Sequence, residues 1–180
     1  EGSAITEIKI KGVTHEFATI EGVKEDVVQL ILNLKKVRFQ IKSEDESVKL
    51  SLKVKGAKEV TAKDIKTSSE VEISNKDQHI ASLTSAKADL DMELKIEKGV
   101  GYVAVEQRER PEKELGAIAI DGLFSPIERV NFEVQDMRVG KRTDYDRIIL
   151  EVKTDGTITP EEAYKKAVQV LLEQFQTITD

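Results

Sequence analysis

A long amphipathic segment near the C-terminal end, residues 160–179, most constrains what this chain can fold into. Thr159 stands where a helix N-cap belongs, Pro160 occupies the first helical position and Glu162 the third. This combination is a capping box with a proline placed where its missing N–H costs nothing. The sequence therefore predicts a helix that begins sharply at Pro160.

The predicted helix carries two neighbouring rows of apolar residues. One row has the spacing of a coiled-coil seam and consists of Tyr164, Val168, Leu171, Phe175 and Ile178. The second row consists of Ala163, Ala167 and Val170, and Leu172 widens it. One row can pack on the protein's own sheet while the other faces a partner helix, or both can be buried within one domain. Period alone does not separate these two arrangements.

Composition narrows the functional classes. With 180 residues, the chain can hold one full core or two modest ones. It has no cysteine, which excludes disulfides, a thiolate zinc site and a cysteine nucleophile. Its formal charge is −6, so we expect no unaided binding to DNA or RNA. No apolar run is long enough to span a bilayer, and no membrane association is expected.

The rest of the chain mixes strand-like and helix-like patterns. Residues 24–36 predict an amphipathic helix, opened by Glu25 and Asp26. Residues 37–42 and 48–54 are expected to pair as an antiparallel hairpin. Other strands are expected over residues 4–11, 71–74, 80–84, 90–97, 127–139 and 147–153, with a charge-dense loop over 106–114 and a turn region over 138–146. Because helices and strands do not alternate strictly, the predicted fold class is α+β.

Residues with catalytic or metal-binding chemistry are few and scattered. His15 lies in a loop and His79 begins a strand, and neither has a second histidine at metal-ligand spacing. The acidic residues are spread along solvated faces, and no two of them are marked as an acid–base pair. Gly99 and Gly101 follow a strand without a helix after them, which favours a turn over a phosphate-binding loop. We therefore expect no catalysis, no cofactor and no stoichiometric metal.

Several short segments carry a more specific signal when they are taken together. They are Gly12–Phe17, Gly22–Val27, Ile31–Lys35, Gly99–Val103, Phe124–Val130, Arg142–Asp146 and Thr154–Ala163. In their order and spacing they resemble one family, the amino-terminal domain of the bacterial RNA polymerase α subunit. Each segment alone is weak, but together they cover essentially the whole chain and are highly specific.

The resemblance implies a non-catalytic scaffold in the bacterial cytoplasm, a homodimer that recruits the β and β′ subunits of RNA polymerase. It implies two subdomains: an inserted mixed β subdomain with a helix, over residues 3–127, and a sheet-plus-long-helix dimerisation subdomain, to which residues 128–180 belong. The family's upstream strand and helix, and its separate DNA-binding domain, have no counterpart in the sequence. We therefore expect an N-terminally truncated fragment, with dimerisation a property of the full-length subunit.

The resemblance also implies where each partner binds. The dimer interface would be the seam of Tyr164, Val168, Leu171, Phe175 and Ile178. The β subunit would contact His15, Glu16 and Lys35. The β′ subunit would contact Ile120, Asp121, Ile127 and Arg129.

Two other classes of function stay open from the residues alone. A generic α+β adaptor with another partner is the alternative, and recovery of β and β′ from a bacterial lysate would separate the two. A hydrolase that uses scattered carboxylates is the third, and it requires a concave pocket with shifted carboxylate pKa values.

Overall fold

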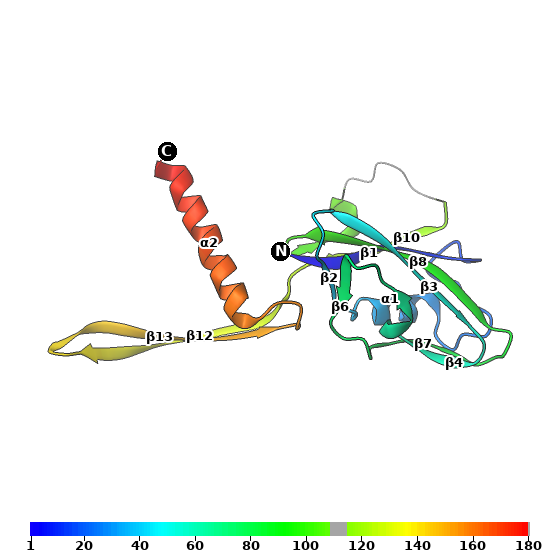
Figure 1. The fold of residues 1–180 in the computed structure, drawn as a ribbon, viewed down its shortest axis with the longest axis horizontal. Helices are drawn as coiled ribbons and strands as arrows, with labels where there is room; N and C mark the ends of the chain where they lie inside the picture. The colour runs from blue at the N-terminus through cyan, green and yellow to red at the C-terminus, as the bar shows by residue number, and fades with distance from the viewer. Residues whose placement is uncertain (109–114, 180) are drawn as a thin grey trace. The chain divides into compact units, whose positions relative to one another are not determined.

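The computed structural model describes residues 1–108 and 115–179, and it divides into two compact units (Figure 1). Unit 1 is Glu1–Ser125 and unit 2 is Pro126–Asp180. The division lies close to the boundary between residues 127 and 128 that the resemblance implies. Of the charge-dense loop expected over residues 106–114, residues 109–114 lie outside the described part. Strands dominate and two α-helices accompany them in the described residues, which confirms the α+β class.

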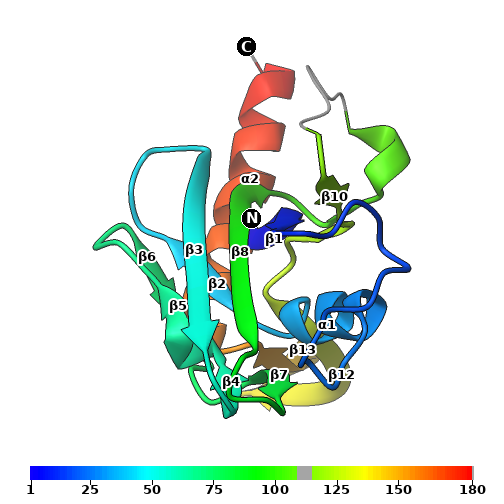
Figure 2. The same ribbon diagram turned by 90° about the vertical axis from the view of Figure 1, so that its right-hand side faces the viewer.

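Unit 1 is built on a seven-stranded sheet with the order β5-β3-β8-β1-β2-β6, and β10 pairs with β1 outside this path. Its strands are β1 (Gly2–Ile10), β2 (Phe39–Ile41), β3 (Ser47–Lys55), β5 (Ile65–Lys66), β6 (Val71–Ile73), β8 (Asp89–Gly99) and β10 (Ala117–Ala119). Figure 2 shows β3, β8 and β1 side by side. Two small pairs join β4 (Lys58–Thr61) to β7 (His79–Leu83) and β9 (Tyr102–Val103) to β11 (Gly122–Leu123). Single 3₁₀ turns occur at η1 (Ala62–Asp64) and η2 (Val105–Gln107).

Strand β8 has one buried face and one solvated face, as its alternating sequence predicts. The buried residues of β8 are Leu90, Met92, Leu94 and Ile96. On the other face Glu93 pairs with Lys49, and Asp91 pairs with Lys53, each at 3.2 Å. The charges on this face therefore neutralise one another across neighbouring strands.

Helix α1 (Val27–Leu34) is shorter than the predicted segment 24–36 because Asp26 caps it. The Asp26 carboxylate accepts a hydrogen bond from the Gln29 amide at 2.7 Å, so Asp26 lies outside the helical turns. Asn33 is buried and donates to the Ile80 carbonyl oxygen at 3.0 Å, which satisfies its side chain. The helix contributes to the core of unit 1 through Val27, Leu30 and Leu34.

The predicted hairpin between residues 37–42 and 48–54 is wrong. Strand β2 pairs with β1 and β6, whereas β3 pairs with β8 and β5, so β8 and β1 lie between them. Strand length gives the physical reason. β3 has nine residues and finds a nine-residue register on β8, from Ser47 opposite Glu97 to Lys55 opposite Asp89. The three residues of β2 cannot offer as many cross-strand pairs.

Unit 2 consists of one long β-hairpin and one helix. Strands β12 (Ile127–Val139) and β13 (Arg142–Thr154) have 13 residues each. The turn predicted over residues 138–146 is too long, because only Gly140 and Lys141, within that region, separate the strands. Gly140 has a φ of +63°, which glycine adopts without steric cost. Helix α2 (Pro160–Thr179) has the predicted bounds. No described helix combines the length and apolar character that a bilayer span needs.

Candidate protein-interaction surfaces

Helix α2 begins with the predicted capping box. The Thr159 amide donates to Glu162 Oε2 at 3.1 Å, and the Glu162 amide donates to Thr159 Oγ1 at 3.3 Å. Hydrogen bonds from the Thr159 hydroxyl and amide hold the pKa of the Glu162 carboxyl below its ordinary value. These reciprocal bonds satisfy donors that the first helical turn leaves free, and they fix the start of the helix.

Both apolar rows of α2 lie open in the described part of the chain. On the seam, Phe175 is 67% exposed and Ile178 is 79% exposed. Val170, on the second row, is 56% exposed. The half-buried residues of the helix are Ala163 and Val168, one from each row. Neither row is therefore buried along its length against the protein's own sheet.

One face of the unit 2 hairpin carries an apolar patch, which ends at the acidic pair Asp136–Asp146. Three cross-strand pairs form it: Val130–Val152, Phe132–Leu150 and Val134–Ile148. Phe132 is 74% exposed and Ile148 is 69% exposed, so this face is uncovered in the described residues. Sequence reasoning missed this surface, although Val130, Phe132 and Val134 alternate with polar residues at the spacing of one strand face. We call it the hairpin face.

The opposite face of the hairpin is mostly polar near its start, where it carries Arg129, and it also includes Ile149. Arg129 Nη2 donates to Glu151 Oε1 at 2.8 Å, and Asn131 Nδ2 donates to Glu151 Oε2 at 3.2 Å. These bonds from Asn131 and Arg129 lower the pKa of the Glu151 carboxyl. Arg129 is thus an exposed residue already bound to Glu151, its diagonal neighbour on β13. Ile127, the first residue of β12, is half-buried.

Two predicted site residues of unit 1, assigned above to different partners, lie together. Lys35 Nζ is 3.5 Å from Asp121 Oδ2. The hydrogen bond from the Val105 amide is the largest influence on the Asp121 carboxyl, and together with Lys35 it lowers the pKa of that group. Both side chains are about one-third exposed. Ile120, in contrast, is 3% exposed and belongs to the core of unit 1, so its side chain is not available on the surface.

The other predicted contacts of unit 1 lie at the opposite end of α1. His15 and Glu16 are exposed on the loop after β1, and the Val27 amide donates to Ala18 of the same loop. About 12 Å of helix therefore separates this loop from Lys35. The loop also exposes Phe17, a residue that the sequence reasoning did not select.

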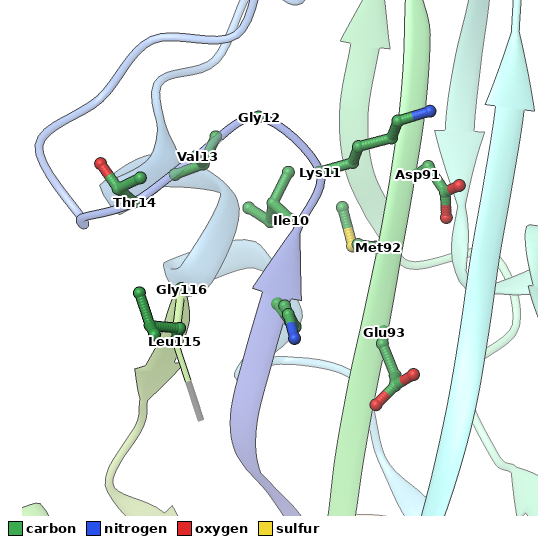
Figure 3. A pocket seen from close by; sticks show the side chains of 11 residues that line it. Ile10, Lys11, Gly12, Val13, Thr14, Asp91, Met92, Glu93, Leu115 and Gly116 are labelled. Carbon is green, nitrogen blue, oxygen red and sulfur yellow. The ribbon is translucent and has the colours of Figure 1, made fainter. Parts of the chain in front are cut away.

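A pocket of about 520 Å³ lies beside this loop, between the end of β1, strand β8 and residues 115–116 (Figure 3). Its acidic residues are Asp91 and Glu93, which are the partners of Lys53 and Lys49 on the solvated face. Its carboxylates are therefore parts of surface ion pairs. Among the described residues, no cluster of three or more histidine, cysteine or acidic side chains forms a candidate metal site.

Comparison with known proteins gives one consistent result. The family described as "RNA polymerase Rpb3/RpoA insert domain" matches residues 8–125, more than half of the chain. The chain is similar to proteins named "DNA-directed RNA polymerase subunit alpha". It is 44% identical over 177 residues to the one from Aquifex aeolicus (98% of this chain and 56% of the relative). It is 46% identical over 181 residues to the one from Limosilactobacillus reuteri (99% and 57%).

A third relative, from a Roseiflexus species, carries the same name and is 46% identical over 179 residues, which are 99% of this chain and 54% of the relative. The chain thus spans a little more than half the length of the curated relatives it matches. Identity at this level over nearly the whole chain shows common ancestry with these proteins. The chain belongs to the family of DNA-directed RNA polymerase α subunits.

Proposed function

We propose that this chain acts as a non-catalytic assembly scaffold of bacterial DNA-directed RNA polymerase, a nucleotidyltransferase complex in the cytoplasm. Two copies pair through unit 2, and the dimer recruits the β and β′ subunits. The names of the relatives support membership of the polymerase. Nothing in the comparisons favours a generic adaptor with another partner.

One observation carries the scaffold proposal: unit 2 leaves its apolar surfaces uncovered. The hairpin face and both rows of α2 expose large aliphatic and aromatic side chains. A two-stranded hairpin is marginally stable by itself, and contiguous exposed apolar surface marks a protein interface. A unit of this construction is stabilised when other polypeptide covers it, as expected of an assembly subunit.

For the dimer we propose the seam of α2, packed against the same seam of a second copy. A twofold interface brings one surface patch onto itself, so a helix seam can serve both subunits. The residues proposed are Tyr164, Val168, Leu171, Phe175 and Ile178. Residues 128–180 would thus form the C-terminal part of a dimerisation subdomain, and residues 3–127 the inserted subdomain.

For the large subunits we propose two surfaces at the two ends of α1. His15 and Glu16 form the β-facing surface. Lys35, expected above as a β contact, shares an ion pair with Asp121, and we propose the two together as a second, β′-facing surface. Ile120 supports Asp121 from the core. Arg129 and Ile127, in unit 2, are proposed as further β′ contacts.

The dimer is tested with variants of the subunit at the length of its relatives. Phe175→Glu should give a monomer in sedimentation equilibrium, because the interface would bury an unpaired charge. Thr177→Glu, off the seam of the same helix, should stay dimeric. If the dimer persists in Phe175→Glu but is lost in Val170→Glu, then the second row, and not the seam, forms the interface. A dimer unaffected by both changes would contradict pairing through α2.

A further inference from the structure

Arg108 is a nearly buried arginine that ties three parts of unit 1 together. Its side chain is 18% exposed. Nη2 donates to the carbonyl oxygen of Thr6 in β1, at 3.0 Å, and to that of Ile120, between β10 and β11. Nη1 donates to the carboxylate of Glu97 in β8, at 3.2 Å. One planar guanidinium therefore fixes β1, β8 and the segment before Asp121.

A backbone hydrogen bond from the same segment also holds Asp121. Asp121 Oδ1 accepts a hydrogen bond from the Val105 amide at 3.1 Å. Val105 begins η2, the short turn that ends immediately before Arg108. The segment 105–108 thus holds the segment 120–121 at two points, through the amide of Val105 and the guanidinium of Arg108. This leaves Asp121 Oδ2 facing Lys35.

The ion pair between Lys35 and Asp121 could not hold this geometry by itself. Exposed ion pairs contribute little, because fixing two side chains costs about as much as their attraction gains. Asp121 is fixed instead by the hydrogen bond from the Val105 amide to its carboxylate and by the bond from Arg108 to the neighbouring Ile120 carbonyl oxygen. Less conformational freedom is therefore lost when a partner binds. Lysine could not replace Arg108, because its single ammonium lacks the planar fork of donors.

We propose that Arg108 is a positioning residue for a large polymerase subunit, holding Asp121 and Lys35 in the geometry that the partner recognises. The inference rests on the proposed β′-facing surface and adds a residue that does not touch the partner. It predicts that Arg108 acts on binding only through Asp121.

The test measures the affinity of purified β′ for a preformed complex of two α subunits and one β subunit. The variants are Arg108→Lys, Asp121→Asn and the double variant, with Arg147→Lys, at an exposed arginine of β13, as the matched control. We expect each single variant to bind about tenfold more weakly, and the double variant to bind no more weakly than the weaker single variant. Arg147→Lys should bind like the parent.

Each other outcome overturns a separate statement. Unchanged binding by Arg108→Lys, or additive losses in the double variant, would overturn the positioning role and leave the β′-facing surface intact. Unchanged binding by Asp121→Asn would overturn the proposed surface itself.

Amide hydrogen exchange separates positioning from a general structural role. In Arg108→Lys the Val105 amide should exchange faster, while the Leu94 amide in the core of β8 keeps its protection. Loss of protection at both amides would show that Arg108 only maintains the fold, which would also overturn the inference.

Discussion

At the scale of single residues, two glycines make room for one aromatic ring at the end of unit 1. Phe124 is 5% exposed, and its amide donates to the Gly101 carbonyl oxygen at 2.8 Å. A β-carbon at Gly122 would lie 2.4 Å from the ring, and one at Gly99 would lie 2.7 Å from it. Non-bonded carbon atoms do not approach so closely, so any side chain at Gly122 must displace the ring or the strands.

We therefore expect Gly122→Ala to destabilise unit 1 by about 1–3 kcal/mol, as other overpacked cores are destabilised. Urea unfolding of the 180-residue chain, followed by signals of unit 1 residues, measures the change. The same substitution should cost less in a Phe124→Leu background, because the smaller side chain relieves the overlap. Equal costs in both backgrounds would show that the ring is not the cause.

The capping box could be predicted from the sequence, whereas the Arg108 cluster could not. Thr159 and Glu162 are three positions apart, so local rules place their side chains together. Thr6 lies 102 positions from Arg108, and their contact exists only after β1 and the segment near Ile120 have joined one sheet. The Lys35–Asp121 pair escaped the sequence reasoning for the same reason.

At the scale of elements, Glu25 connects the start of α1 to strand β7. Its carboxylate accepts hydrogen bonds from the Ser82 amide at 2.7 Å, the Ser82 hydroxyl at 3.1 Å and His79 Nε2 at 3.0 Å. Burial opposes ionisation of Glu25, but these hydrogen bonds outweigh it, so its pKa lies below the ordinary value. The carboxylate therefore stabilises the fold in its charged form.

The sign of the pH dependence follows from this lowered pKa. The stabilisation is complete above the ordinary value of 4.5 and is lost as the pH falls below it toward the pKa of the folded state. Glu25→Gln should lower the free energy of unfolding by about 1.5–3 kcal/mol at neutral pH. When the unfolding midpoint is plotted against pH, the variant should lose less stability on acidification than the parent. Glu21→Gln, at an exposed glutamate nearby, is the control. If Glu25→Gln loses as much stability on acidification as the parent, the stabilising role of the charged Glu25 carboxylate is contradicted.

Element types were more predictable than strand pairing. The period of β8 and the box before α2 are local signals, and both predictions are confirmed. The partner of β3 is not a local property, because it depends on which strand elsewhere matches its length and its pattern of charges. Proximity along the chain favoured β2, but nine matched pairs with β8 outweighed it.

At the scale of the whole molecule, the hairpin face should contribute, beside the seam of α2, to how the chain associates with other chains. Phe132→Thr keeps a residue suited to strands but removes a large exposed aromatic side chain. We expect this variant to associate less with rising concentration in sedimentation velocity. Glu133→Thr, on the opposite face of the hairpin, should associate like the parent. Identical association of both variants would mean that the hairpin face plays no part.

The strand order of unit 1 also determines how the chain behaves during its synthesis. β1 is translated before the other strands of its sheet but lies inside the sheet, and its main partner is β8, Asp89–Gly99. At about 5–20 residues per second, the ribosome leaves Ile5, Ile8 and Ile10 without that partner for several seconds. The hairpin of unit 2, in contrast, closes across two residues as soon as it emerges. During synthesis, β1 is thus an apolar strand that a chaperone would shield until β8 has emerged.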